Sequence, residues 1–225
     1  MNNNQNILSN KKISIIDEIL LKSKIIPILV EDDINNAFNA VEALLEGGIT
    51  VIEVTLRTQK AFKISESILK KFPKMTVGIG TILNKAQLIE AFSIGAHFGV
   101  SPGLSTDLTD LILDDNIDFP YMPGVSNPSE IMACMKDSFL TLKCFPASSS
   151  GGIEFLKQMN SVFSTIKFCP TGGINQTNAL DYLSLQNVIS VGGSFVLPKE
   201  AINNKDWKSI TKIAKLFSKR EINVT

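Results

Sequence analysis

The chain has 225 residues, of which 44% are hydrophobic and 20% are charged. This length and composition predict one globular domain over residues 1–225 with a large buried core, and they argue against global disorder. Lys and Arg together number 22, as do Asp and Glu, so the formal net charge is zero. Without a basic surplus, neither nucleic acid nor an anionic membrane is expected as a partner.

The start of the chain, residues 1–11, is rich in Asn and has no apolar core. We expect a flexible tail there rather than a signal peptide. No apolar run approaches the roughly 20 residues needed to span a bilayer. The three cysteines form no CxxC pair, which favours a reducing, cytoplasmic location over a disulfide framework. Because the chain has a single histidine and no Cys/His cluster, no metal site is expected.

Short apolar runs alternate with amphipathic stretches along the chain. The predicted strands are Ile25–Val30, Val51–Leu56, Thr76–Thr81, His97–Ser101, Phe119–Met122, Leu140–Phe145, Ile166–Pro170 and Val188–Val191. The predicted helices between them are Asn35–Leu45, Gln59–Lys71, Lys85–Ile94, Thr106–Leu113, Ser129–Met135, Ile153–Asn160 and Thr177–Leu183. A helix at Lys12–Lys22 is expected before the first strand, and one at Lys205–Arg220 after the last.

This alternation predicts an α/β fold with a parallel sheet. Eight strand–helix units favour a single (β/α)8 TIM barrel with an extra N-terminal helix, and an open doubly wound sheet is the alternative. Gly and Pro gather directly after the predicted strands. Turns alone explain most of them, but in barrels this end of the strands carries the active site.

The second predicted strand, Val51–Leu56, carries polar residues on one face. Alternation places Glu53 and Thr55, and Arg57 just beyond them, opposite an apolar face that should meet the helices. An acid and a base inside a barrel are costly unless they are paired or functional. Two hypotheses follow: a structural Glu53–Arg57 pair, or a proton-transfer carboxylate below an anion-binding guanidinium.

The sixth predicted strand, Leu140–Phe145, places Thr141, Lys143 and Phe145 on its inward face by the same rule. A lysine inside an apolar barrel is not a solvated surface group. A neutral amine there would be a nucleophile toward a ketone, and the structural alternative is a salt bridge with Glu53. Phe145 serves equally as core or as a cover for a bound keto acid.

Lys167 is the rival lysine, because it shares inward parity with Cys169 on the seventh strand. It opens that strand, however, at the barrel end where stability rather than chemistry is expected. His97 opens the fourth strand, and a packing or rim role is the simpler interpretation.

Glycine pairs end the last two predicted strands, Gly172-Gly173 and Gly192-Gly193, and Ser194 follows the second pair. Barrels often bind phosphate at these positions through bare backbone N–H groups. Neither pair matches a P-loop or a dinucleotide fingerprint. We therefore expect a phosphate group without a nucleotide.

These motifs resemble those of the 2-keto-3-deoxy-6-phosphogluconate (KDPG) aldolases, which are grouped with the 4-hydroxy-2-oxoglutarate (KHG) aldolases. The matching stretches stand in the family's order and cover roughly residues 25–200 of the sequence. They are IIPIL (25–29), EGGITVIEVTLRT (46–58), VGIGTILN (77–84), GAHFGVSPGL (95–104), MPGVSNPSE (122–130), LKCFPASSSGG (142–152), FCPTGGIN (168–175) and VGGSFVLP (191–198). The combination of EVTLRT, KxFPA and CPTGG is specific to this family.

The resemblance implies a class I aldolase, a carbon–carbon lyase that cleaves KDPG to pyruvate and glyceraldehyde 3-phosphate without cofactor or metal. Lys143 would form the Schiff base and Glu53 would be the general acid/base. The implied substrate-binding residues are Arg57, Thr81, Phe145 and Thr171, and the implied phosphate-binding residues are Gly172, Gly173, Gly193 and Ser194. The partner would be a small keto acid, and members of the family are commonly homotrimers.

One stretch departs from the family pattern. After FPA this chain has Ser148-Ser149-Ser150, where many members have Glu-Ala-Asn, and this loop could contact the aldehyde half of the substrate.

The sequence leaves three alternative functions open. They are a same-fold aldolase for 2-keto-3-deoxy-6-phosphogalactonate or KHG, a sugar-phosphate isomerase, and a non-catalytic phosphate-binding barrel.

Overall fold

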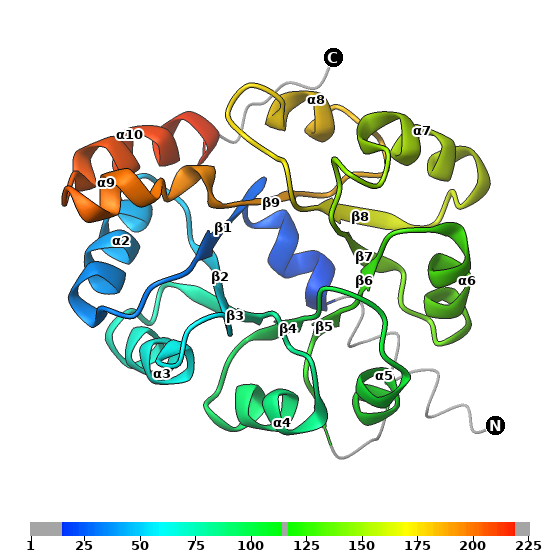
Figure 1. Ribbon diagram of the computed structural model, residues 1–225, viewed down its shortest axis with the longest axis horizontal. Helices are drawn as coiled ribbons and strands as arrows, with labels where there is room; N and C mark the ends of the chain where they lie inside the picture. Colours follow the sequence, from blue (N-terminus) through cyan, green and yellow to red (C-terminus); the bar gives the residue numbers. More distant parts are fainter. Residues whose placement is uncertain (1–14, 114–116, 219–225) are drawn as a thin grey trace.

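The computed structural model describes residues 15–113 and 117–218. Its strands are β1 (Ile25–Leu29), β2 (Val51–Thr55), β3 (Thr76–Gly80), β4 (Phe98–Val100), β5 (Tyr121–Met122), β6 (Gly124–Val125), β7 (Thr141–Cys144), β8 (Lys167–Pro170) and β9 (Val191–Gly193). All strand pairs are parallel, in the orders β5-β4-β3-β2-β1-β9 and β6-β7-β8. The sheet is curled, with helices along its outside (Figure 1).

The outer helices are α2 (Ile34–Glu46), α3 (Ala61–Lys71), α4 (Lys85–Ser93), α5 (Thr106–Leu113), α6 (Pro128–Lys136), α7 (Gly152–Val162), α8 (Ala179–Leu183), α9 (Lys199–Asn203) and α10 (Trp207–Ser218), with a 3-10 turn η1 at Ser194–Val196. Side-chain caps explain where several begin. Asp33 accepts hydrogen bonds from two N–H groups of α2, and Asn84 and Asn127 cap α4 and α6 in the same way. None of the described helices is both long and apolar enough to cross a membrane.

The predicted alternation of strands and helices is confirmed, although many limits shift by one or two residues, as where α3 begins at Ala61 rather than Gln59 and α10 at Trp207 rather than Lys205. Three of the corrections have a local cause. The last strand is Val191–Gly193 rather than Val188–Val191, because Val188 makes only an isolated bridge to Phe168. The fifth is Tyr121–Met122, and Gly124–Val125 follows after Pro123, which has no N–H to continue the ladder.

The third correction concerns α8, which begins at Ala179 rather than Thr177. The Asn175 side chain accepts hydrogen bonds from the Thr177 and Asn178 N–H groups and holds this segment in a turn. The turn η1 and helix α9 were not predicted. Parts of two predicted helices, residues 12–14 and 219–220, lie outside the described residues, as does the predicted tail.

The buried side chains form two clusters, one on each face of the sheet. The outer cluster packs under the helices and includes Ile52, Val54, Leu142 and Cys144. The inner cluster combines strand residues such as Val51 and Cys169 with residues of the N-terminal helical segment 15–21. This division confirms the predicted alternation of β2 and β7, and it places Glu53 and Lys143 on the inner face.

The helical segment 15–21, dark blue in Figure 1, lies inside the curl of the strands. Its apolar residues Ile16, Ile19 and Leu20 belong to the inner cluster. Its Asp17 accepts a hydrogen bond from the Thr141 hydroxyl and forms an ion pair with Lys167, 2.6 Å from Asp17 Oδ2 to Lys167 Nζ. The segment therefore closes the amino end of β7 and β8, opposite the end where Gly and Pro follow the strands.

Candidate active site

Two buried side chains of opposite charge meet on the inner face of the sheet. Lys143 on β7 is 5% exposed and Glu53 on β2 is 2% exposed. The Lys143 Nζ atom lies 3.1 Å from Glu53 Oε1 and 3.4 Å from Oε2. A structural salt bridge and a catalytic pair would both show this contact. The groups around the contact are therefore needed to distinguish the two interpretations.

A glycine makes room for the Glu53 carboxylate. A Cβ atom at Gly80, which is in register with Thr55 on the neighbouring strand, would lie 2.0 Å from Glu53 Oε1. Only a residue without a side chain fits beside the carboxylate in this position. Gly80 is one of the glycines near predicted strand ends that turns alone would explain. Its role beside Glu53 was not predicted, because a glycine's spatial neighbour cannot be identified from one sequence.

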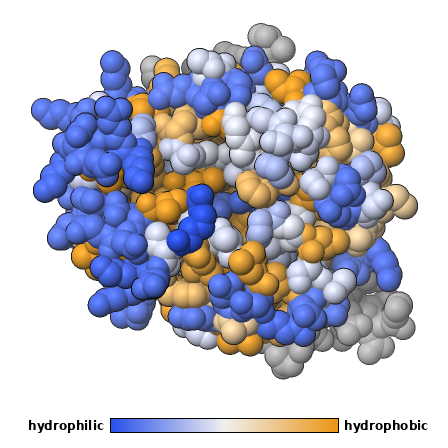
Figure 2. All heavy atoms as spheres, in the orientation of Figure 1, coloured by the Kyte–Doolittle hydropathy of each residue, from blue (hydrophilic) through white to orange (hydrophobic). Residues whose placement is uncertain are grey.

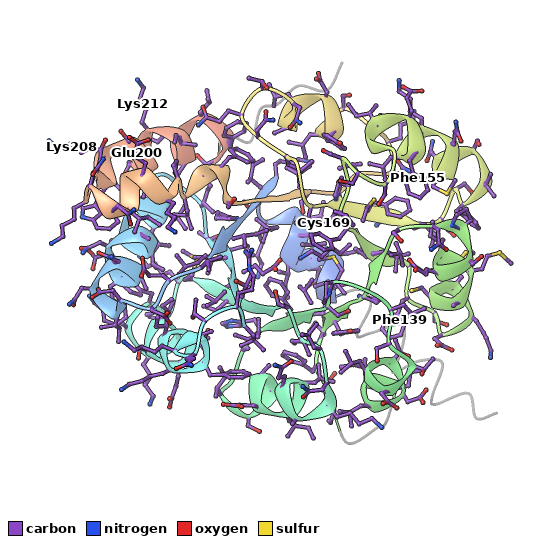
Figure 3. All side chains as sticks on the ribbon, viewed as in Figure 1. Phe139, Phe155, Cys169, Glu200, Lys208 and Lys212 are labelled. Atoms are coloured by element: carbon purple, nitrogen blue, oxygen red, sulfur yellow. The ribbon has the colours of Figure 1, made fainter. Side chains whose placement is uncertain are left out.

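Two further groups surround the Lys143 amine. The Phe145 ring centroid lies 5.5 Å from Lys143 Nζ. Cys169 on β8 is in register with Lys143 and lies in the middle of the molecule (Figure 3). Burial raises the pKa of the Cys169 thiol to about 11, so this neighbour is uncharged at neutral pH. The amine therefore has one acid, one aromatic ring and one neutral thiol near it.

Arg57 lies just beyond β2 and is exposed. Its Nε donates to Thr55 Oγ1 at 3.2 Å, and the Thr55 hydroxyl donates to the Leu29 carbonyl. Among the described residues no carboxylate forms an ion pair with Arg57. The structural Glu53–Arg57 pair considered from the sequence is therefore not found, and the guanidinium is available to an anion.

Thr81, the residue after Gly80, has a φ of 63°. This left-handed backbone conformation is uncommon for a β-branched residue, and such outliers gather at functional sites. The conformation lies at the carboxyl end of β3, on the strand next to the one that carries Glu53.

The two predicted glycine pairs lie side by side. An isolated parallel bridge joins Thr171 to Gly192. Gly172 and Gly173 have φ of 95° and 79°, which favours glycine at both positions. Gly193 is extended, with φ −163°, and leads into η1, whose first residue Ser194 is exposed. Two loops of small residues thus meet at the carboxyl ends of β8 and β9.

A cavity of about 580 Å³ is lined by two of the predicted site residues, Arg57 and Ser194. Its other lining residues are Ile28, Val30, Glu31, Asp32, Thr58, Phe195, Leu197, Pro198, Lys199, Ile202 and Asn203. Figure 2 shows hydrophobic side chains near the centre of the face seen in Figure 1 and hydrophilic ones over α2, α9 and α10. The volume is in the range typical of small-molecule sites.

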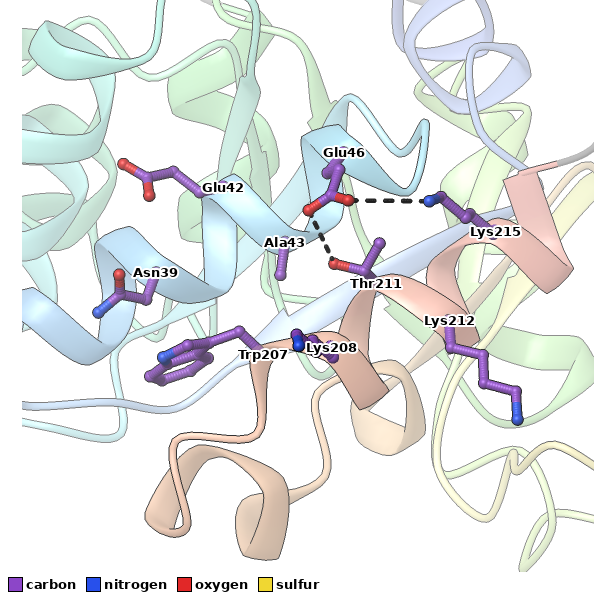
Figure 4. Close-up of a pocket in the computed structure, with 9 residues that line it drawn as sticks. All are labelled: Asn39, Glu42, Ala43, Glu46, Trp207, Lys208, Thr211, Lys212 and Lys215. Atoms are coloured by element: carbon purple, nitrogen blue, oxygen red, sulfur yellow. Dashed lines mark hydrogen bonds and ion pairs between the residues drawn. The ribbon is translucent and has the colours of Figure 1, made fainter.

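Two other cavities are lined by none of the residues that were singled out for chemistry. One is a groove between α2 and α10 that includes Trp207 (Figure 4), where Lys215 and Thr211 contact Glu46. The other lies between Gln176 and the last turns of α10. Neither is part of the candidate site.

The rival lysine lies elsewhere, as predicted. Lys167 is the first residue of β8, is exposed, and pairs with Asp17 at the closed end of the strands. His97 is exposed, and its Nδ1 atom accepts a hydrogen bond from the Val77 N–H at 3.0 Å, in keeping with a position at the rim. The structure thus brings Lys143, Glu53 and Phe145 together, while Lys167 and His97 contact other partners.

Comparisons with known proteins give a consistent result. The chain matches the KDPG and KHG aldolase family model over residues 16–213. It is 41% identical over 198 residues to the 2-dehydro-3-deoxy-phosphogluconate aldolase of Pseudoalteromonas atlantica, covering 88% of this chain and 91% of that protein. It is 39% identical over 199 residues to the KHG/KDPG aldolase of Escherichia coli K12, covering 88% and 92%.

Solved structures with similar folds include several aldolases, among them the following two. The KDPG aldolase of Legionella pneumophila, with pyruvate captured as a covalent carbinolamine intermediate, is 40% identical with a TM-score of 0.86, covering 90% of this chain and 97% of that one. The 2-keto-3-deoxy-6-phosphogluconate aldolase of Zymomonas mobilis ZM4, with 3-phosphoglycerate, is 38% identical with the same TM-score, covering 93% and 98%.

Proposed function

The chain belongs to the KDPG and KHG aldolase family, and from this membership and the site geometry we propose that it cleaves KDPG to pyruvate and glyceraldehyde 3-phosphate through an imine on Lys143. The observation that carries the residue assignment is the buried contact between Lys143 and Glu53, 3.1 Å between Nζ and Oε1. A nucleophile with a general base in hydrogen-bond reach is the arrangement that covalent catalysis requires.

The reaction begins when the neutral amine of Lys143 attacks the C2 ketone. The amine must first lose its proton, and the Glu53 carboxylate is within reach to take it. In the resulting carbinolamine the C2 hydroxyl leaves as water after it receives that proton from Glu53, which becomes a carboxylate again. The iminium ion that forms can accept an electron pair. This sink makes a metal or a cofactor unnecessary.

Carbon–carbon cleavage follows from the same pair of residues. Glu53 removes the proton of the C4 hydroxyl, the C3–C4 bond breaks, and its electrons pass into the iminium to give an enamine. Glyceraldehyde 3-phosphate leaves as the aldehyde. Glu53 then returns the proton that it took from the C4 hydroxyl to C3 of the enamine, and water hydrolyses the imine to release pyruvate and free Lys143.

The ends of the substrate bind at the ends of the strands. Arg57 holds the carboxylate of the keto acid, supported by its lack of an ion-pair partner among the described residues. Thr81, Phe145 and Thr171 line the keto acid half. The phosphate binds at Gly172, Gly173, Gly193 and Ser194, supported by the bridge that joins their two loops and by positive φ at the first two.

We further propose that the curled sheet is a full (β/α)8 barrel with the N-terminal helix as its extra element. The short gap at Pro123 between β5 and β6 and the bridges from β8 to Val188 and Gly192 support closure. We also propose a single domain over residues 1–225, a homotrimer and a cytoplasmic location. Light scattering on the purified protein tests the trimer.

Borohydride trapping tests the role of Lys143. Pyruvate alone should form the imine, since only the ketone takes part, and borohydride should reduce it to a stable secondary amine. Mass spectrometry of a digest should find the added mass on the Lys143 peptide. Lys143→Met should abolish labelling and cleavage and keep the fold, because Met approximates the volume of the lysine stem.

Lys167→Met is the matched control, because it removes the other lysine of inward parity and should retain labelling. A label on Lys167, or cleavage by Lys143→Met, would contradict the assignment. Glu53→Gln should keep some labelling but slow turnover by roughly 10²–10⁴-fold, the usual contribution of general acid–base catalysis. Parallel assays with KDPG, its C4 epimer and KHG distinguish the three keto acid substrates.

A further inference from the structure

The loop after β7 lies directly against the proposed phosphate site. The Ala147 N–H donates to the Thr171 carbonyl at 2.8 Å, and the Ser148 N–H donates to the Gly172 carbonyl at 3.1 Å. These two bonds join the loop after β7 to the segment after β8. Because both bonds join backbone atoms, they hold Ser148 beside the Gly172-Gly173 pair in any conformation of its side chain.

The Ser148 side chain lies over Gly173. A Cβ atom on Gly173 would be 2.1 Å from Ser148 Oγ and 2.5 Å from Ser148 Cβ. The serine hydroxyl therefore occupies the space beside the bare α-carbon of Gly173. Ser148 is exposed, and no hydrogen-bond partner of its hydroxyl is found in residues 15–113 and 117–218.

None of the three serines of this loop caps the helix that follows it. Ser is a preferred N-cap residue, whose hydroxyl accepts from the first helical N–H groups. Here the N-cap of α7 is Gly151, with φ 103° and no side-chain cap bond. The hydroxyl of Ser148 is consequently available to a ligand, and Ser148-Ser149-Ser150 brings no charge that would repel an anion.

We propose that Ser148 donates its hydroxyl to the phosphate group of the substrate and is a specificity-determining residue for the phosphorylated aldehyde half. This inference rests on the proposed function, because it takes Gly172, Gly173 and Ser194 as the phosphate site. Ser148 adds a side-chain donor from the loop after β7, the strand that carries Lys143. The donor would favour KDPG over KHG, which has no phosphate.

Steady-state kinetics of Ser148→Ala with KDPG and KHG test the proposal. Ser148→Ala removes a hydrogen bond to a charged group in the complex. This loss should raise the KM for KDPG about tenfold. The kcat for KDPG and both constants for KHG should stay within about twofold of the unmodified chain. Ser148→Glu should raise the KM for KDPG further, because a carboxylate beside the phosphate repels it, and added salt should reduce this excess.

Ser149→Ala is the matched control, since Ser149 is a neighbouring exposed serine, and it should leave both substrates unaffected. An unchanged KM for KDPG in Ser148→Ala, or equal losses for KDPG and KHG, would overturn the proposal. Ser194→Asp and pyruvate trapping on Lys143 separate this outcome from failure of the proposed function. If Ser194→Asp weakens only KDPG and trapping persists, the phosphate site stands and Ser148 is not part of it.

Discussion

The carboxylate of Glu53 occupies the volume that a methyl group on Gly80 would need. The distance of 2.0 Å between that methyl position and Glu53 Oε1 is too short for two non-bonded heavy atoms, so one group must move. The carboxylate is the end of a flexible side chain, whereas Gly80 is held in β3. A substitution at Gly80 should therefore displace Glu53 without breaking the strand.

Gly80→Ala is predicted to lower kcat/KM for KDPG on the order of a hundredfold, because a catalytic group shifted by about 1 Å loses that much. Pyruvate should still be trapped on Lys143, though more slowly. Gly103→Ala is the control, since its Cβ meets no atom within 4 Å. If Gly80→Ala kept full activity, Glu53 would not act from the position seen here.

The sequence predicted the site only as far as the alternation of side chains along a strand shows which residues share a face of the sheet. Alternation along β2 and β7 placed Glu53 and Lys143 on the inner face, and they do meet there. The contact of Ser148 with Gly173 was not predictable, because it depends on how two loops from different strands approach each other. The alternation of single strands contains no information about that approach.

At the scale of elements, the N-terminal helical segment is attached to the strand that carries Lys143. Asp17 contacts both Thr141 on β7 and Lys167 on β8. Thr141 is 2% exposed, so its hydroxyl has no water to replace a lost partner. The segment therefore joins the amino ends of two neighbouring strands.

Asp17→Ala is predicted to lower the free energy of unfolding by about 1–3 kcal/mol, the cost of leaving a buried polar group without its partner. Urea denaturation followed by circular dichroism measures it. Glu154→Ala removes an exposed ion pair, 2.9 Å between Glu154 and Lys157, and should cost less than about 1 kcal/mol. Equal effects of the two variants would show that Asp17 adds nothing beyond a surface contact.

Element boundaries were harder to predict than element types. Helix α5 begins at its predicted residue, Thr106. The start of α8 was set too early, because hydropathy does not reveal that the Asn175 side chain holds the preceding turn. The last strand was placed too early because Val188 is apolar, whereas the pairing of β9 with β1 begins at Val191. Side-chain hydrogen bonds and strand register decided these limits.

At the scale of the whole molecule, the groups proposed for one reaction come from strands that are distant in the chain. Glu53 and Arg57 belong to the β2 region, Lys143 to β7, and Ser194 follows β9. Their relative positions therefore depend on the integrity of the entire sheet. Global stability and activity should change together wherever a perturbation acts on the packing between strands.

One such perturbation is pH, acting through the single histidine of the chain. His97 is exposed, but partial desolvation of its ring lowers its pKa below the ordinary value of 6.5, and the charge of Lys22 acts in the same direction. Below pH 6.5 the unfolded chain binds a proton that the folded chain does not. The free energy of unfolding should therefore fall as pH decreases from 7.5 through 6.5 toward 5.5.

His97→Gln tests this dependence, because an amide oxygen can still accept from the Val77 N–H but cannot be protonated in this range. Urea denaturation at several pH values should give a small decline for the unmodified chain and a flatter profile for the variant. The interval lies above the ordinary range of Asp and Glu, so carboxylates contribute little to the difference. Parallel profiles for the two proteins would mean that groups other than His97 control stability over this interval.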